Sequence, residues 1–242
     1  MWSRLSPKIR GIATAIVAAA AVLIVVQIME IVWYGLQDYK LKEASVSFSS
    51  EKGVLGKVLI VGDSTGVGVG ATRPEESIAG LLNKDGYAVK NLAEWGALTK
   101  ETLVQIKKEE GNKYDLVFVF TGGNDIIWMR DLKKTALYFQ DVLDEAKNIG
   151  RKVVVMPPGN VGLAPVFKEP IGLLYASRTA FIREFFIREA RESGAVYVDL
   201  FTNSLEELFE GDSERYFAAD FFHPNSEGYR IWYQKLKEQV EI

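Results

Sequence analysis

The sequence predicts an α/β domain built on a five-stranded parallel sheet, preceded by one transmembrane helix. From Lys57 onward, short apolar runs alternate with amphipathic stretches, which is typical of a three-layer α/β/α arrangement. A run of 19 residues without charge lies near the N-terminus. The 242 residues are 48% hydrophobic, so the chain can bury a substantial core.

The uncharged run extends from Gly11 to Met29. As a helix it would span ~28 Å, about the thickness of the hydrocarbon core of a bilayer. Basic residues precede it and acidic residues follow it, namely Arg4, Lys8, Arg10, Glu30 and Asp38. By the positive-inside rule we predict a single-pass protein of the plasma (inner) membrane, with a cytoplasmic N-terminus and an extracytoplasmic domain.

A cleaved signal peptide is the alternative, because Ala18 to Ala21 offer small-residue cleavage sites and would give a secreted protein. The apolar run continues past these alanines to Met29, where a cleavage region would already be turning polar. This continuation favours a retained signal anchor.

Residues 37–53 are polar and rich in Ser and Lys, without a clear helical or strand period, which is typical of a flexible linker. The predicted organisation is a cytoplasmic N-terminus and anchor over 1–36, a linker over 37–53 and a folded domain over 54–242. With such a tether the anchor would add nothing to a site in the domain. A chain that begins near Lys52 is therefore expected to fold and to keep its function.

Within the domain, five apolar runs are predicted to be strands, at 57–61, 87–92, 116–121, 153–156 and 196–200. Five stretches are predicted to be helices, at 77–82, 99–110, 132–149, 178–193 and 225–240. The connection 157–175 is long and apolar, with Gly and Pro residues that break regular structure. It is predicted either to form an acyl-binding wall or lid, which could face the bilayer, or to pack simply on the sheet.

Residues with chemical potential follow the predicted strands. Ser64 follows the first strand, Gly96 the second and Asn124 the third, while Asp220 and His223 follow the fifth through a longer loop. In a parallel sheet, ligands bind at the carboxyl ends of the strands. We therefore expect these residues to meet above one edge of the sheet.

Their types suit acyl transfer. His223 is the single histidine of the chain, and Asp220 lies three residues before it, a spacing that lets Asp220 orient the ring while the ring takes a proton from Ser64. A strand-to-helix turn would expose the Ser64 hydroxyl. Gly96 and Asn124 can form an oxyanion hole, because glycine lets a backbone N–H approach closely and an amide donates without a charge.

Four segments carry a family resemblance: Gly62-Asp63-Ser64, Glu94-Trp95-Gly96-Ala97, Thr121-Gly122-Gly123-Asn124-Asp125 and Asp220-Phe221-Phe222-His223-Pro224. Their order, Ser, Gly, Asn, His, resembles the SGNH (GDSL-type) hydrolase family over roughly residues 57 to 235. One position departs from the pattern, since Thr65 stands where the name motif has Leu. The chemistry is unaffected because that Leu does not react.

The resemblance implies a flavodoxin-like SGNH hydrolase fold and a serine esterase or lipase that needs no metal ion or organic cofactor. It implies a triad of Ser64, His223 and Asp220, with an acyl-enzyme on Ser64. The oxyanion donors would be the backbone N–H groups of Ser64 and Gly96 and the side chain of Asn124. Asp220 is preferred to Asp199, because the acid of the family's triad stands three residues before the histidine.

The substrate class stays open at this point. An acyl lipid such as a lysophospholipid suits the anchor and the apolar loop, while an O-acetylated envelope glycan suits the predicted location equally well. The predicted partners are accordingly a small-molecule or lipid ester and the membrane. The alternative function is a catalytically silent domain that binds an acylated ligand, and the presence of all four motif residues argues against it.

Composition excludes several other classes. The formal net charge is −3, and it becomes −6 once Arg4, Lys8 and Arg10 are set aside, so no nucleic-acid partner is expected. The chain has no cysteine and one histidine, which excludes disulfides and cysteine or histidine-rich metal sites. Residues 66–71 match the dinucleotide fingerprint loosely, but the match starts four residues too late after the strand.

Overall fold

The computed structural model describes residues 6–242, so Arg4 lies outside the described residues. Its centre is one sheet of five strands in the order β2-β1-β3-β4-β5, with every neighbouring pair parallel. The strands are β1 (Gly56–Gly62), β2 (Tyr87–Asn91), β3 (Tyr114–Phe120), β4 (Gly150–Val155) and β5 (Val196–Tyr197). The predicted parallel sheet is confirmed, although β5 ends at Tyr197, three residues earlier than expected.

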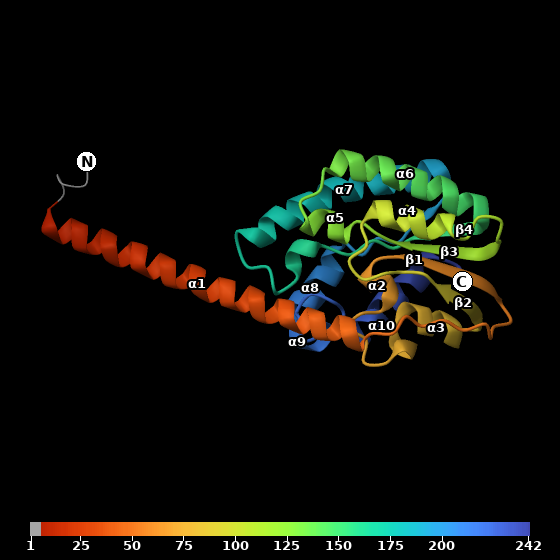
Figure 1. Ribbon diagram of the computed structural model, residues 1–242, viewed down its shortest axis with the longest axis horizontal. Coiled ribbons are helices and arrows are strands. Elements are labelled where there is room, and N and C mark those ends of the chain that lie inside the picture. Colours follow the sequence, from red (N-terminus) through yellow and green to blue (C-terminus); the bar gives the residue numbers. More distant parts are fainter. Residues whose placement is uncertain (1–5) are drawn as a thin grey trace.

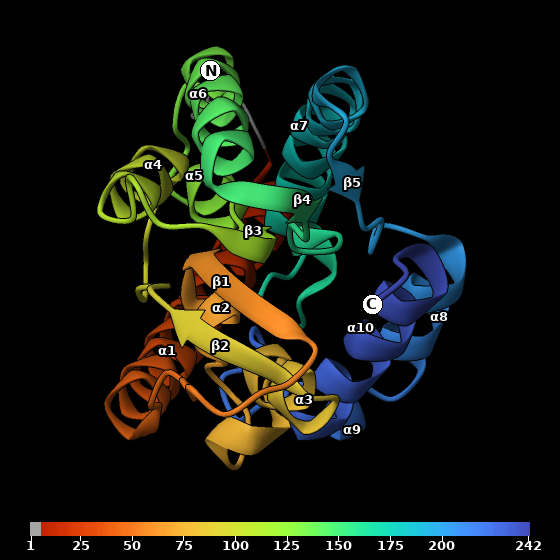
Figure 2. The ribbon, with the colours of Figure 1, turned by 90° about the vertical axis from the view of Figure 1, so that its right-hand side faces the viewer.

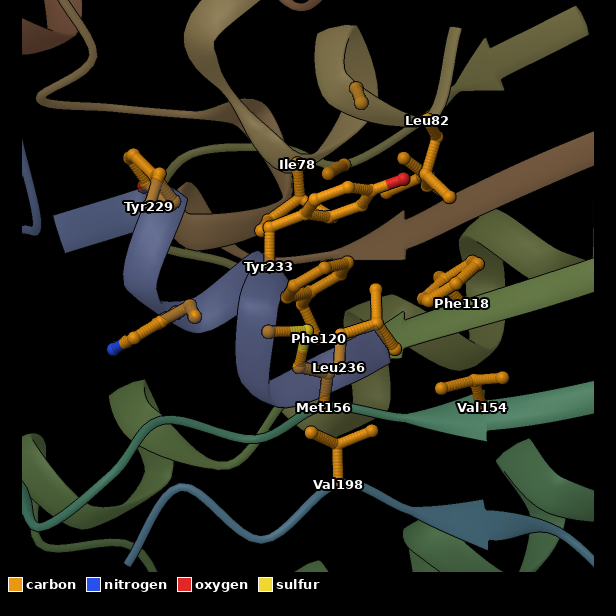
Figure 3. Packing of buried hydrophobic residues seen from close by; sticks show 14 of the residues in the cluster. Ile78, Leu82, Phe118, Phe120, Val154, Met156, Val198, Tyr229, Tyr233 and Leu236 are labelled. Atoms are coloured by element: carbon orange, nitrogen blue, oxygen red, sulfur yellow. The ribbon is translucent and has the colours of Figure 1, made fainter. Parts of the chain in front are cut away.

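Alternate residues of each strand point to opposite faces, so each face has its own core. On one face, Phe118 and Phe120 pack against Ile78, Tyr229 and other side chains of α3 (Ile78–Lys84) and α10 (Ser226–Gln239) (Figure 3). The other face is covered by α4 (Thr99–Lys107), α6 (Leu132–Ile149) and α7 (Ile171–Ser193). Figure 2 shows the sheet between these two helical layers.

Short helices occupy the loops that follow the strands. They are α2 (Ser64–Val67) after β1, α5 (Gly123–Ile127) after β3, and α8 (Asn203–Gly211) and α9 (Ser213–Tyr216) after β5, with 3-10 turns at Pro74–Glu76 and Val161–Leu163. The helix predicted at 178–193 begins earlier, at Ile171. The apolar connection predicted over 157–175 is therefore shorter, because its last five residues form the first turns of α7.

The N-terminal helix α1 runs from Pro7 to Ala44 and includes the whole apolar run. Among residues 6–242 it is the one helix long and apolar enough to cross a membrane, and a signal sequence passes the same test. Figure 1 shows its N-terminal part projecting away from the domain and its C-terminal part lying against it.

The linker prediction for residues 37–53 is wrong in its first half and incomplete in its second. Residues 37–44 are helical, and Leu41 packs against the core of the domain. Ser50 then pairs with Val89 of β2 through two backbone hydrogen bonds of 2.8 and 2.7 Å. Tertiary contacts hold this segment in place, and a period search within the segment cannot detect them.

Candidate active site

Ser64 stands at the first residue of α2, directly after β1. The turn is tight because Gly62 has φ 131°, and a Cβ there would lie 1.7 Å from the Phe120 carbonyl oxygen of β3. Asp63 caps the helix by accepting from the Thr65 backbone N–H. The first N–H groups of a helix have no partner within it, so α2 leaves the Ser64 N–H without an intrahelical acceptor.

His223 and Asp220 complete a hydrogen-bonded chain with Ser64. The Ser64 Oγ lies 2.7 Å from His223 Nε2, and His223 Nδ1 lies 2.6 Å from Asp220 Oδ2. All three side chains are buried. Because a carboxylate can only accept, Nδ1 carries the ring proton and Nε2 is left to accept from the serine hydroxyl. The predicted dyad loop and the serine therefore meet, although α2 and the loop come from distant parts of the chain.

The loop that carries His223 is strongly constrained. Asp220 Oδ1 accepts from the backbone N–H groups of Phe222 and His223, each at 3.0 Å. Phe221, which stands between Asp220 and Phe222, has φ 52°, a left-handed conformation that is unfavourable for a bulky residue. The hydrogen bonds to Asp220 hold this conformation and fix the direction of the imidazole ring.

Gly96 lies in the loop after β2, and Asn124 lies in α5, which follows β3; β2 and β3 are the two neighbours of β1 in the sheet. Gly96 has φ 75°, and a Cβ there would meet open space. The Asn124 Nδ2 donates to the Ala97 carbonyl at 3.1 Å, so one N–H fixes the amide against the Gly96 loop. The second N–H of the amide is left for a ligand.

Two acidic residues near the site have structural contacts. The Asp125 carboxylate accepts from Thr99 N and Oγ1 and from Thr135 Oγ1, at 2.9 to 3.0 Å, and so joins the start of α4 to α5 and α6. Asp199, the alternative acid, pairs with Arg183.

Burial raises the pKa of Asp63 to about 6, and the two hydrogen bonds from Thr65 and the nearby His223 oppose this rise.

An apolar cavity of about 80 Å³ lies beside the triad, bordered by His223 and by Thr65, the residue after the serine. Its other walls come from α8, α10, the connection after β4 and the loop that carries His223, and include Val161, Leu163, Leu205, Phe209, Phe222 and Trp232. The connection that was predicted to form an acyl-binding wall or lid thus contributes apolar side chains next to the histidine.

Sequence reasoning missed one residue at the site. Asp38 of α1 has its Oδ1 3.7 Å from His223 Nδ1, on the side of the ring where Asp220 also lies. The sole signal in the sequence was the acidic flank of the apolar run, which we read as a topology marker.

The sequence of the chain matches a family model described as the GDSL-like lipase/acylhydrolase family over residues 60–231. The chain belongs to this family. The match spans the four motif segments from Ser64 to His223, and it identifies this GDSL-like protein as an ester-cleaving hydrolase.

Solved structures share the fold of this GDSL-like hydrolase. TesA matches with a TM-score of 0.57 and 19% identity, covering 76% of this chain and 98% of its own. A catalytic mutant of Axe2, an acetylxylan esterase from Geobacillus stearothermophilus, gives 0.59 and 17%, covering 78% and 95%. The psychrotrophic esterase EstA from Pseudoalteromonas sp. gives 0.55 and 16%, covering 76% and 95%. No curated protein sequence matches the chain.

Proposed function

We propose that the protein hydrolyses carboxylic esters through an acyl-enzyme on Ser64. The proposal is carried by the continuous hydrogen-bonded chain from Ser64 Oγ through His223 to Asp220. In the first step Oγ attacks the acyl carbonyl carbon while His223 Nε2 takes the hydroxyl proton. Asp220 keeps the ring in the required tautomer and stabilises the imidazolium that forms.

The carbonyl oxygen gains negative charge in this step, and we expect three donors to stabilise it: the backbone N–H groups of Ser64 and Gly96 and the second N–H of the Asn124 amide. His223 then returns its proton to the leaving alkoxide, which departs as the alcohol. Water attacks the acyl-enzyme, His223 takes the proton of that water, and the acid leaves as Ser64 recovers its hydroxyl.

We further propose that α1 is retained as a membrane anchor and that the domain lies outside the cytoplasm. The apolar run ends at Met29, and the next residue, Glu30, pairs with Lys168 at 2.5 Å. This ion pair holds the connection before α7 close to the end of the apolar run, which supports a position of that connection near the membrane surface. Leu173 and Leu174, in the first turn of α7, expose 63% and 48% of their surfaces, which suits contact with the membrane surface.

This placement favours an acyl lipid such as a lysophospholipid as the substrate. Asp38, beside the triad, is nine residues past Met29, about 14 Å along the helix axis, so the catalytic serine lies close above the lipid headgroups. The apolar cavity next to His223 can receive part of an acyl chain. An O-acetylated glycan would use neither feature.

The test uses the full-length protein in lipid vesicles. A fluorophosphonate probe should label Ser64, as located by mass spectrometry, and Ser64→Ala should abolish both labelling and hydrolysis of p-nitrophenyl butyrate. Ser204→Ala, a change of an exposed serine on α8, should do neither. Activity near wild type in Ser64→Ala would refute the mechanism.

The same preparation separates the substrates. We expect release of fatty acid from lysophospholipid in the vesicle to exceed release of acetate from an O-acetylated glycan. The opposite preference would assign the enzyme to glycans and leave the serine mechanism intact.

A further inference from the structure

Helix α1 continues beyond the apolar run and contacts the loop that carries His223. Its Tyr34 ring contacts Phe221 of the His223 loop edge to face, with ring centroids 5.4 Å apart. Leu41, two turns further along, packs against the core. The C-terminal part of α1 is therefore fixed to the domain on both sides of Asp38 (Figure 1).

One oxygen of Asp38 faces two parts of the active site. Oδ1 accepts a hydrogen bond from the Trp95 indole Nε1 at 3.2 Å, and the same oxygen lies 3.7 Å from His223 Nδ1. Trp95 directly precedes Gly96, whose N–H is one of the proposed oxyanion donors. A single side chain on the anchor helix thus contacts the loop of the general base and the loop of the oxyanion hole.

The charges around this contact are mostly negative. His223 faces Asp220 at 2.6 Å from its own loop, Asp38 from α1 and Asp63 from the cap of α2. Lys42, one turn along α1, faces Asp38 and lies over the Trp95 ring, with Nζ 4.3 Å from its centroid. Burial raises the pKa of Asp38, and a charge on His223 opposes that rise.

We propose that Asp38 is a positioning residue of the active site, through which the anchor helix holds His223 and the Gly96 loop in their catalytic arrangement. The catalytic half of this proposal rests on the proposed function. Its geometric half, the contact of Asp38 with His223 and Trp95, does not.

The physical effect follows from the charge of Asp38. When His223 takes the serine proton it becomes an imidazolium, and a carboxylate 3.7 Å from Nδ1 stabilises that cation. Loss of the charge should make the ring harder to protonate. Loss of the hydrogen bond to Trp95 should also free the Gly96 loop, which lowers the rate of the chemical step more than it weakens substrate binding.

The first measurement is an NMR titration of the imidazole in full-length protein, which is unambiguous because the chain has one histidine. Asp38→Asn should move the titration midpoint to lower pH by about half a unit or more, the scale of two unit charges ~4 Å apart even in water. Glu43→Gln removes the same charge from an exposed position of α1 and should leave the midpoint unchanged.

The second measurement is kinetic, on a soluble ester with the same full-length variants. Asp38→Asn should lower kcat several-fold with little change in KM, and should move the acid limb of kcat/KM to lower pH by the same amount as the NMR midpoint. Trp95→Phe keeps the carboxylate but removes its donor, so it should lower kcat while moving the midpoint less.

Wild-type values of both midpoint and kcat in folded Asp38→Asn would overturn the proposal. If Asp38→Asn does not fold, Trp95→Phe decides, because an unchanged kcat in that variant would equally contradict it. A shifted midpoint in a protein without any esterase activity would refute the proposed function and leave the placement of Asp38 standing.

Discussion

At the scale of single residues, Asp220 uses its two oxygens for two purposes. Oδ2 accepts from the His223 ring, while Oδ1 accepts from two backbone N–H groups of the loop that carries that ring. The second set of bonds is local and compensates for the left-handed Phe221. The spacing of three residues matters because it lets one carboxylate bind both the ring and its backbone.

Asn124 offers the most direct test of the proposed oxyanion hole. Asn124→Ala removes one of three donors and should lower kcat by roughly 10²-fold to 10³-fold, with KM little changed. Steady-state kinetics on p-nitrophenyl butyrate measures the effect, and Asn148→Ala, an exposed position at the end of α6, serves as the control. An effect confined to KM would instead assign Asn124 to substrate binding.

Asp63 should make stability depend on pH. Its pKa of about 6 lies above the usual 3.8, so between these values the folded protein keeps a proton that the unfolded chain has lost. Stability therefore falls as pH rises through this window. Asp63→Asn cannot ionise and still accepts from Thr65. The free energy of unfolding of this variant, relative to that of wild type, should therefore rise between pH 4 and 7, by up to about 3 kcal/mol.

Urea denaturation at several pH values measures this difference. Asp144→Asn, an exposed change on α6, should show no such trend. A constant difference between Asp63→Asn and wild type from pH 4 to 7 would contradict the raised pKa of Asp63.

At the scale of elements, α7 begins seven residues earlier than predicted, at Ile171 instead of 178. The Arg178 side chain donates to the backbone carbonyls of Ile126 in α5 and of Arg130 after it, at 3.2 and 2.6 Å. These bonds hold α7 to α5 and to the turn that follows, while the first turn of α7 extends beyond Arg178. That first turn carries the exposed Leu173 and Leu174 and lies next to Lys168, the partner of Glu30.

Leu173→Asp should separate membrane contact from chemistry. The side chain is exposed, so folding and hydrolysis of a soluble ester should stay near wild type. Hydrolysis of lysophospholipid in vesicles should fall, because a charge at this position opposes contact with the bilayer. Val104→Asp, an equally exposed apolar site on α4, should affect neither substrate, and equal losses in both variants would argue against a membrane-facing α7.

At the scale of the whole molecule, α1 joins the apolar run and the active site in one continuous helix. The sequence predicted that a chain beginning near Lys52 keeps its function, whereas the contacts of Tyr34, Asp38 and Leu41 with the domain lead us to expect a loss of activity. The predicted division into anchor, linker and domain accordingly needs a later boundary for the helix, at Ala44.

Two truncated chains test this arrangement. A chain that begins at Glu30 lacks the apolar run but keeps every contact of α1 with the active site, so its kcat/KM on a soluble ester should match that of the full chain. A chain that begins at Lys52 should lose about tenfold or more, the effect of ~1.4 kcal/mol of transition-state stabilisation. Equal activity of the two chains would instead support the prediction of a flexible tether between the apolar run and the domain.

The sequence by itself determined the sheet, its parallel strands and the edge at which the site forms. Hydrophobic periodicity is a local property, so the strands and the longer helices can be predicted from it. Parallel strands bring their carboxyl ends to one edge, and this rule placed Ser64, Gly96 and Asn124 together before any contact was known. The pairing of Asp220 with His223 was likewise predictable because both lie on one loop.

Tertiary structure alone decided the conformation and contacts of the segment after the apolar run. Residues 37–44 are polar and lack a clear helical period, and they stay helical because Leu41 and Asp38 contact distant parts of the domain. Asp38 meets His223 only when the C-terminal part of α1 packs against the loop before α10. Such a contact depends on the docking of elements far apart in sequence, which no local pattern records.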